Sequence, residues 1–511
     1  MKRAIFAVFA ILLCVLLAVS IAAAQTSTTG QIAGTVKDPT GAVVPNAKLT
    51  LVSAAGGQQE ATADAEGRFR FPLLVPGEYT LTAEAAGFRT ATYQAIKVNV
   101  TETAQISVPL ALQSATETVT ISAEPPLVDT DNPTTGRVVA ESQVKQLPLP
   151  TRNFQQLLTL SPGTVANLSN NTEMGRGDVN IYVNGQRDTS NNVVIDGTMV
   201  NSPGTNSTPN ISVPSPDAIQ EFIVQTSLYD ATQGRNSGGN VALVTKSGTS
   251  KFHGSAFEFL RNDALNANDY FLNQAGRARP VLKRNQFGGT FGGPIVKDKT
   301  FFFVSYQGTR ERNGASRTNS LMSPNMPSVL TDARATAAGQ DAIAQAFLGA
   351  ATTWANVNPV AQKLLLAKLP NGQWAIPNAA AVGATPATPV TTPISAISRF
   401  TEDQFMVNID QSLGQKNKLS GKFFFSDTPQ YQANFTFQGA NAFQAPGYGG
   451  MIDFHNRVLS LNDTHIFTPN VVNQFHAGYS RINGPSQPEE PFKASDFGIT
   501  NPLCAGNARF C

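Results

Sequence analysis

The second half of the chain repeats one pattern, in which apolar and polar side chains alternate over stretches of about ten residues. Phe302, Val304 and Tyr306 share one face of such a stretch, and Phe423 and Phe425 share one face of another. Successive side chains of a strand point to opposite faces, so each stretch has an apolar and a polar side. Strands of this kind joined by short turns are typical of outer-membrane β-barrels, whose apolar side contacts lipid.

Composition excludes several other classes of protein. The net charge is only +2, which leaves no basic surface of the kind that binds nucleic acid. The mean hydropathy is slightly negative, so the chain is not a helical membrane protein. The four histidines are too scattered to form a metal site, and no catalytic constellation is present. We therefore expect neither an enzyme nor a bound cofactor or metal.

The N-terminus has the three regions of a secretory signal peptide. Lys2 and Arg3 form the charged region, residues 4–19 form the apolar one, and small residues precede the expected cleavage between Ala24 and Gln25. A membrane-anchor helix is the alternative, but the apolar core is short and no stop-transfer charge follows it.

Export decides how the cysteines are interpreted. Cys14 lies in the apolar core of the leader and leaves with it, so the mature chain keeps Cys504 and Cys511. The exported compartment permits a disulfide between them. Both cysteines could instead pair with residues beyond position 511.

Residues 30–112 are typical of a small β-sandwich, because turn signals recur about every 10 to 20 residues and no helical period is present. This segment contains no His and no Cys, which leaves no zinc site. The predicted strands are Gln31–Val36, Ala47–Val52, Gly67–Phe71, Gly77–Ala83 and Ile96–Val100.

Residues 133–250 mix short strands with helical or turn-like segments. The segments Val138–Leu147 and Arg152–Leu160 are expected to be helical or turn-like, with prolines breaking the chain between them. The predicted strands here and just beyond are Ile181–Val183, Val193–Ile195, Ala218–Val224, Val241–Thr245 and Phe252–Arg261.

Several phrases in fixed order resemble a known family. They are VNGQRDTSNN, VIDG, DAIQEFIVQT, GRNSGGNVALVTKSGTSKFHGSAFEFLRN and NQFGGTFGGPIVKDKTFFFVSYQG, preceded by GTVKDPTGAVVPNAKLTL. Together they resemble a TonB-dependent outer-membrane receptor of the Oar-like branch, which carries an extra carboxypeptidase-regulatory-like domain in front. The resemblance implies a mainly β fold: an N-terminal prealbumin-like sandwich, an α+β plug, and the first strands of a transmembrane barrel.

The resemblance also implies a domain order. We expect a signal peptide at 1–24, the carboxypeptidase-regulatory-like sandwich at 25–113, the plug at 114–250 and a partial barrel at 251–511. The barrel segment shows about seven strands and a long loop at 312–402, whereas barrels with a plugged lumen have about 22 strands. An open edge would leave unpaired backbone groups in hydrocarbon, each costing several kcal/mol. We therefore expect a fragment of a longer protein or a truncated gene product.

The implied function is import. The family binds a ligand at the cell surface and imports it with energy from TonB, which works with ExbB and ExbD in Gram-negative bacteria. The expected partners are TonB, outer-membrane lipid and a small-molecule, oligosaccharide or peptide ligand. The alternative is an Oar-like surface protein with an adhesive or envelope-structural role and no transported substrate.

The segment between sandwich and plug is where this family keeps its TonB contact. An exposed strand before a Pro-containing linker can pair with the edge of another sheet. The alternative is the last strand of the sandwich or the first strand of the plug. The candidate contact residues are Glu117, Thr118, Val119, Thr120, Ile121, Ser122 and Ala123.

Overall fold

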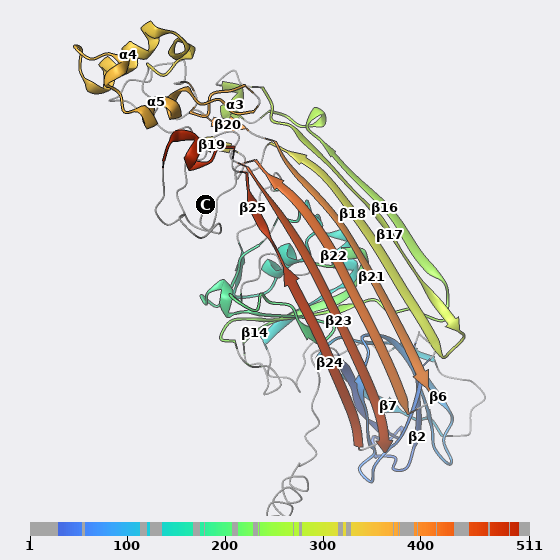
Figure 1. Cartoon of the computed structure of the whole chain (residues 1–511). Helices are drawn as coiled ribbons and strands as arrows, with labels where there is room; N and C mark the ends of the chain where they lie inside the picture. The colour runs from blue at the N-terminus through green and yellow to red at the C-terminus, as the bar shows by residue number, and fades with distance from the viewer. Residues whose placement is uncertain are drawn as a thin grey trace, which may run out of the picture.

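A computed structural model of the chain describes residues 29–53, 57–112, 120–122, 135–166, 174–177, 179–206, 213–227, 234, 236–268, 270–274, 278–314, 320–322, 329–370, 372–376, 378, 393–395, 397–414, 416–433, 449–468, 471–489 and 491–499. They form, in chain order, a β-sandwich, an α+β domain (the plug) and a sheet of long strands (Figure 1). Within these residues no helix is both long and apolar enough to cross a bilayer.

The sandwich packs two sheets around one apolar core. Alternate residues of each strand face inward: in β5 these are Tyr79, Leu81 and Ala83. The sheets have the orders β4-β1-β7 and β3-β2-β5-β6-β8, with β1 parallel to β7. The strands are β1 Gly30–Lys37, β2 Lys48–Ser53, β3 Gln58–Thr62, β4 Arg68–Leu74, β5 Gly77–Glu84, β6 Ala91–Val98, β7 Thr103–Pro109 and β8 Thr120–Ser122. The predicted strands did not include β3 or β7, and β6 replaces the strand predicted at Ile96–Val100.

The plug is built on a mixed sheet of order β13-β12-β15-β14-β9. Its main core lies on one face of β14 and β15 and includes Phe222, Val224, Val241 and Leu243. One prediction is corrected: residues 138–140 belong to a strand, and the helix begins only at Glu141. The elements are β9 Thr135–Ala140, α2 Glu141–Gln146, η1 Phe154–Leu160, β10 Thr164–Ala166, β11 Ile181–Val183, η2 Asp188–Ser190, β12 Asn192–Ile195, β13 Thr198–Met199, η3 Pro216–Ala218, β14 Ile219–Ser227 and β15 Asn240–Thr245.

The remaining long strands form one antiparallel sheet, called the wall here, with β16 and β24 as the edges of its main path. These two edges do not pair with each other among the described strands. The strands of the wall are β16 His253–Asn262, β17 Leu282–Val296, β18 Thr300–Asn313, β21 Ser398–Leu413, β22 Asn417–Gln432, β23 Gly450–Thr468 and β24 Val471–Asn483, and β25 Ser486–Pro488 pairs with β23.

The two ends of the wall differ in the length of their connections. At one end the strands are joined by 297–299, 414–416 and 469–470; at the other the connections are 263–281, 314–397 and 433–449. Figure 1 shows the blue sandwich near the short-turn end and helices α4 and α5 beyond the long-loop end. The long connections hold η4 Asp263–Leu265, α3 Tyr270–Gln274, β19 Ser320–Met322, η6 Asp332–Ala335, α4 Ala337–Leu348, η7 Trp354–Asn356, α5 Pro359–Leu366 and β20 Pro393–Ser395, and η8 Ala494–Phe497 follows the wall.

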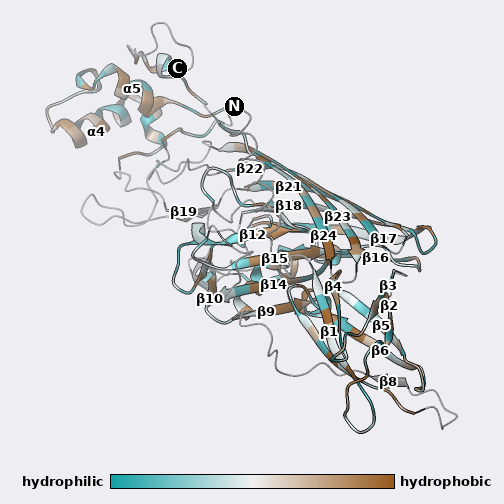
Figure 2. Cartoon of the chain, turned by 90° about the horizontal axis from the view of Figure 1, so that it is seen from below, coloured by the Kyte–Doolittle hydropathy of each residue, from teal (hydrophilic) through white to brown (hydrophobic). Residues whose placement is uncertain are grey.

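The wall buries its polar face and exposes its apolar face, the reverse of a water-soluble sheet. Short apolar and polar stretches follow one another along the long strands (Figure 2). On β18, the side chains of Gln307, Thr309 and Glu311 are buried, while Tyr306 is exposed on the other face. Other exposed apolar residues of the wall are Phe291, Phe405, Ile409, Phe423, Leu461, Phe475 and Tyr479.

Toward the long-loop end, charged side chains replace apolar ones on this exposed face. Counted from the middle of each strand toward the long-loop end, the first charged residue on this face is Arg310 on β18, Asp403 on β21, Asp427 on β22, Arg457 on β23 and Arg481 on β24. Arg310 pairs with Asp403 at 2.8 Å, and Arg457 pairs with Asp427 at 2.8 Å.

Candidate functional site: the joint between plug and wall

The plug lies against the polar face of the wall, and the contacts between them are called the joint. Wall side chains supply part of an ion pair or a hydrogen bond at four places, described below. A buried ion pair adds little net stability compared with apolar packing, because both charges lose water. It does specify where its two partners must lie, and so these contacts fix the position of the plug.

The first contact is a buried ion pair of the wall that forms hydrogen bonds with the plug backbone. Arg284 on β17 donates to both carboxylate oxygens of Glu311 on β18, at 3.0 and 2.9 Å. Glu311 Oε2 also accepts the N–H of Gly175 at 2.8 Å, and Arg284 Nη1 donates to the carbonyl of Pro150 at 3.2 Å. Gly175 and Pro150 are both plug residues, so the pair holds two separate loops of the plug.

The second contact is centred on Arg152 of the plug, whose φ of 55° is a strained value for a residue with a side chain. Its guanidinium is paired with Asp217 of the plug and donates to Gln307 Oε1 of the wall at 3.0 Å. It also lies over the rings of Phe257 and Phe259 on β16, at 4.2 and 4.5 Å from their centroids. Such cation–π contacts are strongest when water is excluded.

The third contact surrounds Asp196, in the turn between β12 and β13. Lys422 Nζ on β22 lies 2.8 Å from Asp196 Oδ1, and the Thr245 hydroxyl donates to Asp196 Oδ2 at 2.7 Å. Asn408 on β21 donates to the same Thr245 hydroxyl oxygen at 3.0 Å. Ser460 on β23 donates to the Asp196 carbonyl. Two wall strands therefore reach this plug turn directly, and a third reaches Thr245 of β15, which is bonded to the turn.

The fourth polar contact and an apolar row complete the joint. Arg176 of the plug reaches Glu402 on β21 at 3.5 Å, and both side chains are buried. Between the polar contacts, four wall residues are part of the main core of the plug. They are Phe303, Met406, Phe424 and Val458.

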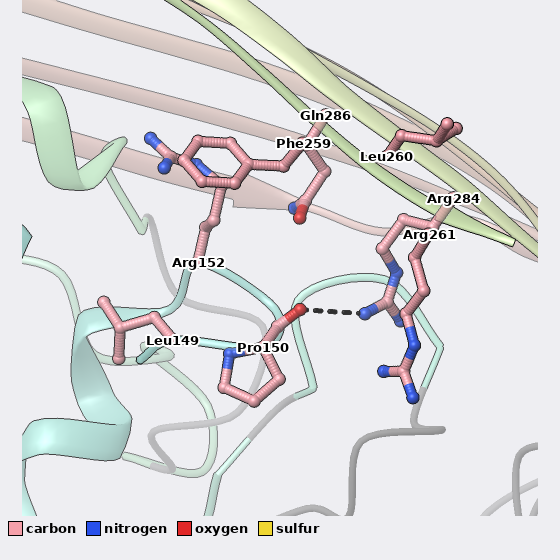
Figure 3. Close-up of a pocket in the computed structure, with 8 residues that line it drawn as sticks. All are labelled: Leu149, Pro150, Arg152, Phe259, Leu260, Arg261, Arg284 and Gln286. Atoms are coloured by element: carbon pink, nitrogen blue, oxygen red, sulfur yellow. Dashed lines mark hydrogen bonds between the residues drawn. The ribbon is translucent and has the colours of Figure 1, made fainter. Parts of the chain in front are cut away.

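A cavity of about 270 Å³ lies beside the joint, where the plug meets β16 and β17 (Figure 3). Three arginines line it: Arg152, Arg261 and Arg284. Arg152 and Arg284 already have the carboxylate partners described above. We therefore interpret the cavity as part of the joint and not as a separate ligand site.

The described part of the predicted TonB segment does not lie at the joint. Of the candidate TonB segment, Thr120–Ser122 form β8, the outermost strand of the larger sandwich sheet, which runs parallel to Thr92–Gln94 of β6. Residues 117–119 and Ala123 lie outside the described residues, as do the cleavage pair Ala24 and Gln25 and the cysteines Cys504 and Cys511. Among the described residues, no group of three or more His, Cys, Asp or Glu side chains is placed to hold a metal ion.

Sequence reasoning missed the residues that form the joint, although a signal was present. Glu311, Glu402 and Lys422 are charged residues on the polar side of strands whose other side is apolar. On a barrel strand that side faces the lumen, where a charge needs a partner. The partner could not be identified, because Asp196 and Lys422 are far apart in sequence and meet only in the fold.

Three family models match segments of the chain. The family described as an outer membrane beta barrel domain matches residues 244–509, more than half of the chain. The carboxypeptidase regulatory-like domain matches residues 31–111, and the TonB-dependent receptor plug domain matches residues 129–241. The chain belongs to the TonB-dependent receptor family. The predicted fold class is thereby confirmed, and the family places this receptor chain in the outer membrane.

One relative of this TonB-dependent receptor chain is the TonB-dependent transporter Oar of Myxococcus xanthus, which is 31% identical over 278 residues. The match covers 51% of this chain and 25% of Oar, so the chain spans about a quarter of the length of that relative.

The receptor chain is also similar to two solved structures. The outer membrane transporter YddB from Escherichia coli is 10% identical with a TM-score of 0.42, and the match covers 69% of this chain and 39% of that one. BauA, the ferric preacinetobactin receptor from Acinetobacter baumannii, is 11% identical with a TM-score of 0.37, and the match covers 70% and 48%.

Proposed function

We propose that the chain is the N-terminal part of a transporter that binds a ligand at the cell surface and imports it with energy transmitted by TonB. The joint supports this proposal most directly. Its ion pairs and hydrogen bonds hold a separate domain against the polar face of the wall. Polar contacts of this kind can be exchanged for contacts with water, so this part of the attachment can be broken and made again.

The direction of transport is supported by the two ends of the wall. In outer-membrane barrels the short turns are periplasmic and the long loops are extracellular. The sandwich near the short-turn end is then periplasmic, and α4 and α5 are extracellular, where a ligand is selected (Figure 1). The ligand is a small molecule, an oligosaccharide or a peptide. The family transports and does not catalyse, and we assign the chain no enzymatic role.

Residues 117–123 remain our candidate for the contact with TonB, which acts with ExbB and ExbD. The position of β8 at a sheet edge supports this, because an edge strand can leave one sheet and pair with another through backbone hydrogen bonds. Backbone pairing makes a clear prediction: the identity of the side chains should matter less than the presence of the N–H groups.

The test is binding of the purified C-terminal domain of TonB to the chain, measured by calorimetry. Ile121→Pro removes a donor and should weaken binding by about tenfold or more, whereas Ile121→Ala should change it by less than about threefold. Ser114→Pro, outside the segment, is the matched control and should bind as the wild type does. Equal binding by wild type and Ile121→Pro would remove the segment from consideration.

A second test separates import from a structural role. Growth of the host on a panel of candidate substrates is compared after deletion of the gene for this chain and after deletion of TonB. Import predicts that both deletions abolish growth on the same substrate. A defect in adhesion or envelope integrity that follows loss of this chain alone, with uptake unchanged, contradicts the proposal.

A further inference from the structure

The sandwich contacts the plug through the turn between β6 and β7, at residues 99–102. Val100, in this turn, is fully buried and packs against Ile223, Ala242 and Val244. These three residues belong to β14 and β15, on the face of the plug sheet opposite its main core. A turn of the sandwich thus covers a small apolar patch on the back of the plug.

A carboxyl group lies within this contact. The side chain of Glu221 on β14 is 3% exposed, and its Oε1 accepts the backbone N–H of Val100. The flanking strands place Ala140 and Val244 beside it, and neither carries a charge. An ionised carboxylate is costly here, because one hydrogen bond replaces its shell of water.

The charges that act on Glu221 come from the sandwich. Lys97 on β6 favours the ionised form, whereas Glu102, held by a hydrogen bond from Asn99, opposes it. Burial dominates and raises the pKa of Glu221 to about 7. When the turn leaves, water returns to the carboxyl group and its pKa falls toward the ordinary value for glutamic acid, about 4.3.

We propose that the contact between Val100 and Glu221 is a pH-dependent latch, which holds the sandwich on the plug in acid and releases it toward neutral pH. The sign follows from linkage. The docked state binds a proton that the undocked state lacks, so docking is strongest below the ordinary pKa of glutamic acid. It weakens as pH rises through the interval up to about 7. The regulated element is the sandwich, which carries β8 at the edge of its larger sheet.

The test is hydrogen exchange of the whole chain in detergent micelles, with each rate divided by the intrinsic amide rate at that pH. The peptide that contains Val100 reports docking, because its N–H is bonded to Glu221. Its protection should fall by up to about tenfold per pH unit between pH 5 and 7, as expected when one proton is linked to docking. Protection in β15 reports whether the plug is folded.

Three variants make the result decisive. Glu221→Gln keeps an acceptor but cannot ionise, so protection should no longer depend on pH. Val100→Ala removes apolar contact and keeps the carboxyl group. Protection from exchange should therefore be lower at every pH, while its change per pH unit should equal that of the wild type. Glu84→Gln removes an exposed carboxylate of the sandwich and should behave as the wild type. Wild-type protection of the Val100 peptide that does not change with pH would overturn the latch. So would a Glu221→Gln variant whose protection still falls with pH as the wild type's does, with β15 still protected.

Discussion

At the scale of single residues, the same alternation has opposite meanings in two parts of the molecule. In β5 of the sandwich the apolar residues Tyr79 and Leu81 point into a core, whereas in β22 of the wall Phe423 points outward. The surroundings decide which side chains face outward, because the outer side of the wall contacts lipid, whereas its inner side contacts the plug through polar side chains and one apolar row. In the sequence, the two cases differed in the length of the alternating stretches, about ten residues in the wall, and in the short turns that join them.

Two adjacent phenylalanines test this reading. Phe424 belongs to the plug core with 4% exposure, whereas Phe423 is 39% exposed on the outer face. Phe424→Ala should lower the free energy of unfolding by about 3–5 kcal/mol, because it leaves a cavity between wall and plug. Phe423→Ala should cost clearly less, since lipid or detergent fills the space. Urea unfolding in lipid vesicles measures both, and equal losses would contradict the assigned faces.

The pair Arg284–Glu311 gives a second prediction at this scale. Arg284→Met leaves Glu311 buried without its cation and should cost about 3–5 kcal/mol of unfolding free energy. Adding Glu311→Leu removes the stranded charge, so the double variant should be more stable than Arg284→Met alone. The same urea titration is applied to Arg284→Met, to Glu311→Leu and to the double variant. If the double variant lost as much unfolding free energy as the two single variants together, the two side chains would not be coupled.

At the scale of elements, most strands of the plug and the wall could be predicted, and the failures have physical causes. β3, Gln58–Thr62, is a polar edge strand with no apolar alternation to detect. Residues 138–140 of β9 were predicted to be helical or turn-like, although the β-branched residues Val138 and Val139 favour an extended chain. Its pairing with β14 decides the outcome, and pairing between distant segments leaves no local signal.

The sandwich gives the prediction that belongs to this scale. We expect residues 25–113 to fold alone, because their core closes within the segment. The expressed segment should show the circular dichroism of a β-protein and a cooperative thermal transition. Neither should change on addition of a chelator. A segment without a transition, or one that loses it with chelator, would mean that the plug or a metal completes the fold.

At the scale of the whole molecule, the fold class could be predicted from the sequence but the joint could not. The phrases that carry the resemblance are local, whereas each contact of the joint links segments far apart in the chain. Arg152 and Gln307 illustrate this, because each looks like an ordinary polar residue until the plug is placed on the wall. Alternation predicts which side chains of a strand face inward, but only the fold shows which plug residues those side chains contact.

Export and the state of the cysteines are tested together by intact-mass measurement of the protein from the envelope fraction. The mature chain should begin at Gln25, and alkylation without reduction should leave Cys504 and Cys511 unmodified if they form a disulfide. A chain that retains Met1 would contradict cleavage by signal peptidase. Two alkylated cysteines would rule out the disulfide and leave the export prediction intact.

The charged residues on the outer face of the wall also fix the inclination of its strands. Arg310 on β18 pairs in register with Thr401, two residues beyond Asp403, and Asp427 pairs with His455, two residues beyond Arg457. Asp403 lies directly opposite Asp427, and Arg457 lies directly opposite Arg481, so the first charge does not shift between the two strands of either pair.

The level at which charge begins therefore descends four residues, or about 13 Å, across four strand spacings, or about 19 Å. A lipid surface is flat, so this descent means that the strands lean by about 35° from the membrane normal, within the range of closed barrels.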